Sequence, residues 1–266
     1  MIKLKSRADI EGLRRCGALS KTVLRLAGEM VRPGVSTLEI DQFVETYIRE
    51  HGGTPGFKGY GGFPASICAS VNDEVVHGFP SADVVLREGD ILSIDTGANV
   101  GGWAGDNAWT FACGRVSDEV RSLLEVTRDC LALGIQQAVP GNHLGDIGHA
   151  IQAHAEDNGY GVVREYVGHG IGHDMHEEPN VPNYGRAHHG IRLEVGMCLA
   201  IEPMITLGDR HVHTLGNGWT VVTNDGLPAA HFENTIAITA DGPVITTAED
   251  GFDPMDVDEG RNAAAR

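Results

Sequence analysis

The stretch ILSIDTGANVGGWAGDNAWTF, residues 91–111, combines two apolar, β-forming runs with an acid inside each. Gly101 and Gly102 separate the runs and favour a tight turn, so the stretch is predicted to form a β-hairpin. If the hairpin is centred between residues 100 and 101, Asp95 and Asp106 lie directly opposite each other on one face. Two carboxylates that close repel strongly, whereas a bound dication turns the repulsion into ligation. The hairpin is therefore the first indication of a metal site.

Two further acids occur in apolar surroundings. Glu202 lies in CLAIEPM, residues 198–204, and Glu233 lies in AHFENTIAIT, residues 230–239. For any one such acid, the commoner interpretation is a buried carboxylate satisfied by a basic side chain or by backbone N–H groups. Four of them together favour metal binding, because the 20 Lys and Arg residues lie elsewhere along the chain.

A histidine supplies the fifth ligand, which is of a second type. The stretch VGHGIGHDMHEEP, residues 167–179, places three imidazoles in a predicted glycine-rich turn. Taken alone it is compatible with a surface loop, but the flanking glycines leave His169 free to reach a metal. His77 has a similar context in NDEVVHGFP, residues 72–80. Four carboxylates and one imidazole suit Mn²⁺, Fe²⁺, Co²⁺ or Zn²⁺. Two such ions can activate water and polarise a carbonyl, so the residues predict metal-assisted hydrolysis.

The composition excludes several other classes of protein. With 20 basic and 37 acidic residues the net charge is −17, which disfavours a direct nucleic-acid reader. No apolar run is long enough for a transmembrane helix, and the first residues do not resemble an export signal. The five cysteines are scattered, without a Cys-x-x-Cys pair, which favours a reducing compartment, and we expect a cytoplasmic protein. Signatures of zincins, serine hydrolases, P-loop enzymes and dinucleotide binders are missing.

The predicted elements follow the same order twice. Capping boxes at Ser6-x-x-Asp9 and Ser36-x-x-Glu39 begin two helices, and two more are predicted from about residue 117 to 140 and from 144 to 156. Strands are predicted after each helix pair, at residues 66–71, 91–96, 103–112, 161–166, 198–205, 219–222, 231–239 and 244–247. The turn Asn224-Asp225-Gly226 predicts a further hairpin. We expect one catalytic domain, residues 1–247, and an acidic, disordered C-terminal tail, residues 248–266.

These motifs occur with the order and spacing of a known family. The motifs are SVN at 70–72, HGFP at 77–80, Asp95-x10-Asp106, GHGIG at 168–172, HEEP at 176–179, IEPM at 201–204 and FE at 232–233. Over about residues 3–247 the chain resembles type I methionine aminopeptidase. The interval from His176 to Glu202 is too short for the helical insert of the type II enzymes, and the short start resembles the bacterial form.

The resemblance implies a fold, an activity and a site. The fold is the α+β pita-bread fold, with two pseudo-symmetric αβ halves around a dimetal cleft. The activity is removal of the initiator methionine from nascent proteins whose second residue is small. The cofactors are two divalent ions, Mn, Fe, Co or Zn, one of them tightly bound. The protein is expected to be a monomer near the ribosome, with the N-terminal peptide of a nascent chain as its partner.

The resemblance also assigns residues. The implied metal ligands are Asp95, Asp106, His169, Glu202 and Glu233, with Asp106 and Glu233 as bridges. His77, His176 and Glu202 are the implied catalytic residues: Glu202 takes a proton, His176 stabilises the oxyanion and His77 assists the leaving group. The implied substrate-binding residues are Tyr60, Phe63, Cys68, His77, Met175, His176 and Trp219, whose aromatic and sulfur groups suit a thioether.

Some positions depart from the family pattern. Phe57, Gly61 and Met175 stand where relatives often carry Cys, His and Phe. His173 follows the glycines where Arg is frequent, and Asn234 replaces a usual His. The ligands are intact, so the departures bear on the shape of the substrate pocket.

Two alternatives remain open at the level of the sequence. A prolidase or aminopeptidase P relative would share the fold, but such enzymes usually carry an additional N-terminal domain. A non-catalytic binding module on the same fold would typically have lost ligands, and all five are present here.

Overall fold

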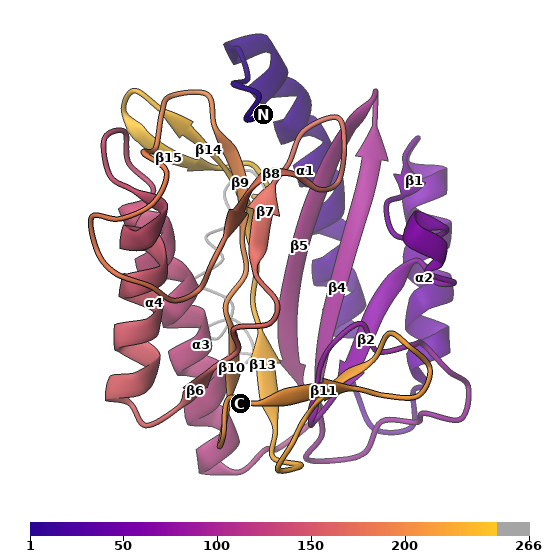
Figure 1. Ribbon diagram of the computed structural model, residues 1–266. Helices are drawn as coiled ribbons and strands as arrows, with labels where there is room; N and C mark the ends of the chain where they lie inside the picture. The colour runs from indigo at the N-terminus through magenta and orange to yellow at the C-terminus, as the bar shows by residue number, and fades with distance from the viewer. Residues whose placement is uncertain (249–266) are drawn as a thin grey trace, which may run out of the picture.

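The computed structural model describes residues 1–248 (Figure 1). Its first two helices begin at the capping boxes that the sequence predicts. In the first helix the Ser6 side chain accepts a hydrogen bond from the Asp9 backbone N–H, and the Asp9 carboxylate accepts one from the Ser6 N–H at 2.9 Å. Ser36 and Glu39 repeat this capping box in the second helix. The helices are α1 (Arg7–Glu29), α2 (Thr37–Glu50), α3 (Asp118–Gln137) and α4 (Leu144–Asp157), with a short 3-10 helix, η1, at Tyr60–Gly62. All four predicted helices are confirmed.

The first half of the fold packs α1 and α2 against one antiparallel sheet. Its strands are β1 (Thr54–Pro55), β4 (Ile91–Val100), β2 (Ile67–Val71) and β5 (Trp103–Ala112). Helix α1 lies so close to β5 that a Cβ added at Gly105 would be 2.9 Å from the backbone nitrogen of Gly17. Glycine at this contact lets the helix support the strand directly before Asp106.

The second half has the same plan, with α3 and α4 packed against strands (Figure 1). One sheet has the order β15-β14-β9-β7-β8, and a smaller sheet has the order β13-β10-β6. A third sheet, β11-β12-β3, pairs strands of the second half with β3 of the first. The bounds are β3 (Glu74–Val76), β6 (Gly161–Val162), β7 (Gly168–Gly170), β8 (Glu177–Val181), β9 (Cys198–Ile201), β10 (Met204–Thr206), β11 (Val212–Thr214), β12 (Val221–Thr223), β13 (Ala229–His231), β14 (Asn234–Thr239) and β15 (Gly242–Ile245). Two helices followed by strands, twice over, is the predicted repeat.

The predicted hairpin between β4 and β5 forms, but its register differs from the expectation. Asp95 pairs with Ala108, and Asp106 pairs with Gly97. The turn is centred between Gly101 and Gly102, one residue later than predicted. The two acids are therefore diagonal neighbours rather than direct partners, and they still share a face because the shift along the strand is even.

Two strands predicted as continuous are each interrupted at an acid. The stretch 198–205 divides into β9 and β10 around Glu202-Pro203, and 231–239 divides into β13 and β14 around Phe232-Glu233. On either side of the break the ladders belong to different sheets, since β9 pairs with β14 and β10 with β13. Pro203 has no N–H to donate to a ladder. Both glutamates therefore lie outside regular strands, each at the point where its strand passes from one sheet to another.

Two other predictions of local structure, a turn and a hairpin, were wrong. The segment around His169, predicted as a turn, is strand β7, which pairs with β8 and β9. The Asn224-Asp225-Gly226 turn makes no hairpin in the part of the chain that the structure describes, because β12 and β13 join different sheets. The Asp225 carboxylate instead accepts from the backbone N–H groups of Asp209 and Leu227.

Two further sequence predictions concern a membrane span and the C-terminal tail, and the structure describes residues 1–248 only. No helix within residues 1–248 is both long and apolar enough to cross a membrane. The predicted tail, residues 248–266, lies outside the described residues except for Ala248.

Candidate active site

A cavity of about 280 Å³ lies where the two halves meet. Its lining divides into charged or imidazole groups and apolar or aromatic groups. The first are His77, Asp95, Asp106, His169, His176, Glu202, His231 and Glu233; the second are Phe57, Tyr60, Phe63, Cys68, Val76, Tyr166, Val167, Met204 and Trp219. Among these described lining residues there is no Lys or Arg, so no basic side chain of the wall neutralises the acids.

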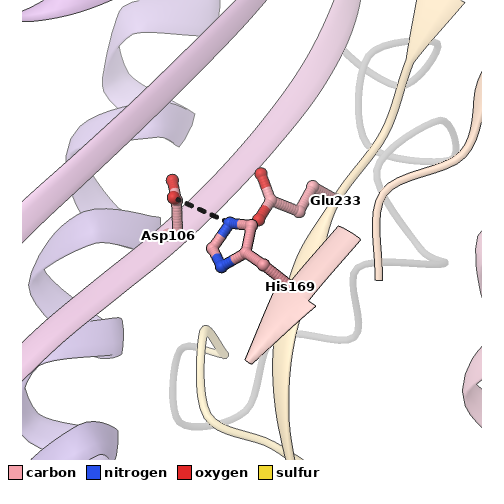
Figure 2. Close-up of side chains that lie close together, drawn as sticks. All are labelled: Asp106, His169 and Glu233. Atoms are coloured by element: carbon pink, nitrogen blue, oxygen red, sulfur yellow. Dashed lines mark ion pairs between the residues drawn. The ribbon is translucent and has the colours of Figure 1, made fainter. Parts of the chain in front are cut away.

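Three of the predicted ligands converge from three separate elements (Figure 2). Asp106 comes from β5, His169 from β7, and Glu233 from the break between β13 and β14. One ligand atom from each lies within 4.8 Å of the others, and all three residues are buried. The Glu233 N–H donates to the Ala108 carbonyl at 2.8 Å, which joins this break to β5. The fold thus brings together residues more than a hundred positions apart.

Asp95 and Glu202 complete the predicted set beside this cluster. The His169 Nε2 atom lies 3.7 Å from Glu202 Oε1 and 3.8 Å from Asp106 Oδ2. These separations are too long for hydrogen bonds. The His169 Nδ1 atom instead bonds its own neighbour's carbonyl, that of Gly170, at 2.9 Å, which leaves Nε2 directed at the acids. All five predicted ligands therefore line the same cavity.

The acids face an unfavourable environment without a cation. Burial first, and then neighbouring carboxylates, raise the pKa of Asp95, Glu202 and Glu233 well above the usual range. Burial raises the pKa of Asp106 to about 7. Burial lowers the pKa of His169 to about 3, so its imidazole is neutral at pH 7. A neutral imidazole is the form that ligates metals.

The donor set fits a divalent metal centre. Asp95 Oδ1, Asp106 Oδ1 and Glu233 Oε1 are buried and have no hydrogen-bond partner among the described residues. Buried polar atoms without partners are rare in folded proteins and need an explanation. Carboxylate oxygens with one imidazole nitrogen match the preferences of Mn²⁺, Fe²⁺, Co²⁺ and Zn²⁺. A cation at this wall would satisfy the atoms that the protein leaves unpaired.

The aromatic part of the cavity is held by ring contacts. Phe63 meets Trp219 edge-on at 5.3 Å between centroids and lies 5.4 Å from Phe79. Cys68 is buried in the wall, and burial, with Asp95 next in effect, raises the pKa of its thiol well above the usual range. The thiol is therefore protonated and weakly nucleophilic. Met175 packs in the buried cluster with Phe57 and Phe63 and is not among the residues that line the cavity.

The two predicted catalytic histidines lie at the cavity, as expected. The His176 Nδ1 atom is 3.0 Å from the Tyr60 hydroxyl, and its ring stacks on Tyr60 at 5.2 Å. The His176 ring centroid is 4.0 Å from that of His169. His77 meets Trp219 edge-on and has a left-handed backbone, with φ of 61°. Burial lowers the pKa of both His77 and His176, so both are neutral at pH 7.

The positions that depart from the family pattern have defined surroundings. Phe57 lines the cavity. Gly61 has φ of 56°, and a Cβ there would be 3.6 Å from the Trp219 ring, so a side chain would narrow this rim. His173 stacks on Trp103 at 3.8 Å. Asn234 Oδ1 accepts a hydrogen bond from the Thr247 hydroxyl at 3.0 Å.

Among the charged and imidazole residues of the lining, sequence reasoning missed His231; among the apolar and aromatic ones it missed Val76, Tyr166, Val167 and Met204. His231 lies on β13, is 2% exposed, and its Nε2 atom is 3.6 Å from Glu202 Oε2. Burial, with His77 next in effect, lowers its pKa to about 3. The available signal was an imidazole two residues before Glu233 in an apolar run.

The family is decided by comparison with known proteins. The model of a family described as metallopeptidase family M24 matches residues 11–240. The chain belongs to metallopeptidase family M24. This M24 chain is 51% identical to a methionine aminopeptidase of Clostridium acetobutylicum, over 93% of this chain and 99% of the relative. As a metallopeptidase of this family, it uses divalent metal ions.

Solved structures place the M24 chain in the expected fold. A crystal structure of methionine aminopeptidase from Thermotoga maritima matches with a TM-score of 0.92 and 42% identity, covering 94% of this chain and 100% of that one. A prolidase from Pyrococcus furiosus matches with a TM-score of 0.74 and 22% identity, covering 92% of this chain and 65% of that one. The prolidase likeness concerns the fold alone. The predicted pita-bread fold of two αβ halves is confirmed.

Proposed function

We infer that this M24 enzyme is a metalloaminopeptidase that removes the N-terminal methionine from nascent proteins whose second residue is small. The observation that carries the inference is the acid–imidazole cluster of Asp106, His169 and Glu233 on the wall of an aromatic cavity. The names of its 51%-identical relative and of the Thermotoga maritima structure support the same activity.

The proposed metal-binding residues are Asp95, Asp106, His169, Glu202 and Glu233, which hold two divalent ions, one of them tightly. When bound, the ions supply Lewis-acid polarisation of the scissile carbonyl and lower the pKa of water. Asp95, Asp106 and Glu233 each have a buried carboxylate oxygen without a hydrogen-bond partner among the described residues, which supports their assignment as ligands. Mn²⁺, Fe²⁺, Co²⁺ and Zn²⁺ all suit the donor set.

The remaining roles belong to side chains around the cluster. Glu202 has 13% of its side chain exposed, more than Asp106 with 4%, and it takes the proton of the attacking water. In the neutral tautomer protonated at Nε2, His176 accepts from the Tyr60 hydroxyl through Nδ1 and donates through Nε2–H to the developing oxyanion. His77, which lines the cavity, assists the departure of the leaving-group nitrogen.

The aromatic part of the cavity accounts for the choice of methionine. A cavity of about 280 Å³ is slightly smaller than the roughly 300–1,000 Å³ of sites for drug-sized ligands. It therefore suits one side chain and the adjoining peptide bond. The aromatic rings of Tyr60, Phe63 and Trp219, with the sulfur of Cys68, give favourable contacts to a thioether. Met175 supports this wall from behind.

We further propose that the enzyme acts as a monomer in the cytoplasm, close to the ribosome, where nascent N-termini emerge. The absence of Lys and Arg from the described lining of the cavity is compatible with a substrate that carries a positive terminal amine. Acids at this wall attract that amine.

The test is methionine release from a Met-Ala-Ser peptide by metal-stripped protein refilled with Mn²⁺, Fe²⁺, Co²⁺ or Zn²⁺. Release is expected with at least one ion and not without metal, and an Asp106→Ala variant should release none. An Ala-Pro peptide in parallel tests the alternative of a prolidase-like enzyme. Cleavage of Ala-Pro without release from Met-Ala-Ser would overturn the proposal. A folded protein inactive on both peptides would favour the binding module.

A further inference from the structure

His231 presents an unpartnered nitrogen to the same wall as the predicted metal ligands. The residue is 2% exposed and lines the cavity. Its Nε2 atom is buried and has no hydrogen-bond partner among the described residues. A buried imidazole nitrogen without a partner costs free energy unless a ligand satisfies it. The observation is independent of the five predicted ligands, since His231 belongs to none of the sequence motifs.

The backbone of His231 is fixed by a reciprocal pair of hydrogen bonds. The Thr110 hydroxyl accepts from the His231 N–H at 2.9 Å and donates to the His231 carbonyl at 2.9 Å. Ser93 contacts the same hydroxyl at 2.8 Å. These contacts join β13 to β5, the strand that carries Asp106. His231 also pairs with Met204, two residues after Glu202, so the pairing of β10 with β13 places its ring beside that glutamate.

Glu202 lies between two imidazoles as a result. Its Oε1 atom is 3.7 Å from His169 Nε2, and its Oε2 atom is 3.6 Å from His231 Nε2. Two donor atoms that share one tetrahedral zinc, each about 2.0–2.1 Å from it, lie about 3.4 Å apart. The two separations are close to that value and longer than a hydrogen bond.

We propose that His231 is a further metal ligand of this enzyme, which binds through Nε2 the ion that it shares with Glu202. The proposal rests on the metal centre of the proposed function. A second imidazole makes this part of the site richer in nitrogen, so it favours Zn²⁺ or Co²⁺ over Mn²⁺. The five family ligands alone, with a single imidazole, give a weaker preference of this kind.

The test observes the imidazoles directly. Full-length protein labelled with ¹⁵N-histidine is stripped of metal and titrated with Zn²⁺, and the ring nitrogens are followed by two-bond ¹H–¹⁵N spectra. The Nε2 signals of His169 and His231 are both expected to shift on saturation. They are assigned by their loss in His169→Gln and His231→Gln, with His231→Asn as a second variant if His231→Gln does not fold. His213, which is exposed on β11, is the control, and its ring nitrogen signals should not shift on titration with Zn²⁺.

Calorimetry supplies the second readout. In His231→Gln the Zn²⁺ affinity of one ion should fall at least about tenfold, the loss typical when even an outer partner of a ligand is removed. Mn²⁺ affinity should change less, and His213→Gln should bind both metals as the native protein does. If the His169 signal shifts and the His231 signal does not, the inference fails and the proposed centre stands. If neither signal shifts, the proposed metal centre fails as well.

Discussion

At the scale of single residues, Asp106 carries a charge that the metal-free protein accommodates poorly. Its pKa is raised by burial from 3.8 to about 7. A raised folded-state pKa gives stability that is present below the unfolded value, near pH 4, and is lost as the pH rises through about 7. Replacing Asp106 with Asn should therefore raise the melting temperature of EDTA-treated protein at pH 7.5. The gain in unfolding free energy is at most about 4 kcal/mol.

The pH dependence distinguishes this effect from simple repacking. The advantage of Asp106→Asn should shrink at pH 5, where the native carboxyl is protonated in the folded state. Asp146 is a contrasting control, because hydrogen bonds from the His143 and His188 N–H groups hold its pKa low despite burial. Asp146→Asn should lower the melting temperature at pH 7.5. A metal-free Asp106→Asn protein less stable than native at both pH values would contradict the prediction.

The same scale shows which site residues a sequence can reveal. The four acids could be predicted because an acid among apolar, β-forming residues is unusual and can be recognised from its immediate sequence neighbours. They are Asp95, Asp106, Glu202 and Glu233. His231 could not be predicted, because its meaning depends on Glu202, which becomes its neighbour only through the pairing of β10 with β13. The glycine pair was enough to predict where the hairpin turns. The residue that pairs with Asp95 could not be predicted, because it depends on which peptide bond lies at the centre of the turn.

At the scale of elements, the N-terminal segment secures the loop that carries His176. The Lys5 ammonium lies 2.6 Å from the Glu177 carboxylate, and both side chains are buried. Removing one partner leaves an uncompensated buried charge, which costs about 3–5 kcal/mol. Lys5→Met should therefore destabilise the protein by about 3 kcal/mol, near the lower end because Lys3 lies 3.8 Å from the same carboxylate. It should also lower kcat, because Glu177 adjoins His176.

Thermal unfolding and steady-state kinetics check this prediction. The melting temperature of Lys5→Met should fall by roughly 6–12 °C. The double variant Lys5→Met/Glu177→Gln should recover part of that loss, since no buried charge remains unpaired. Lys58→Met is the matched control: it breaks the more exposed pair with Glu45 and should cost about 1 kcal/mol or less. Equal effects of the Lys5 and Lys58 substitutions would refute a special role for the segment.

Helices and strands differ in how far their sequences determine them. The helices were predictable because a capping box such as Ser6 with Asp9 is complete within four residues. Strands were harder, because a ladder needs a partner from elsewhere in the chain. The breaks at Glu202 and Glu233 arise where the paired strands pass from one sheet to another, and no local signal except Pro203 marks them. Strand β7 was missed because glycines surround His169.

At the scale of the whole molecule, the proposed metal centre would join the two halves. Asp95 and Asp106 belong to the first half, and His169, Glu202 and Glu233 belong to the second. A bound ion therefore opposes their separation and should stabilise the entire folded state rather than one loop. At a free metal concentration of 100 times the dissociation constant, one ion adds about 2.7 kcal/mol. Refilling metal-stripped protein should therefore raise the melting temperature by roughly 5–11 °C.

Differential scanning calorimetry of stripped and refilled protein measures this linkage. A single transition that moves as a whole is expected, because the proposed ligands come from both halves. Asp106→Ala should abolish most of the shift, since it removes one of the proposed ligands. His213→Gln should retain the full shift, because this exposed histidine lies on β11 outside the ligand set. If none of Mn²⁺, Fe²⁺, Co²⁺ and Zn²⁺ moved the transition of the native protein, the centre would not link the halves. If only part of the transition moved, the ions would be bound by one half alone.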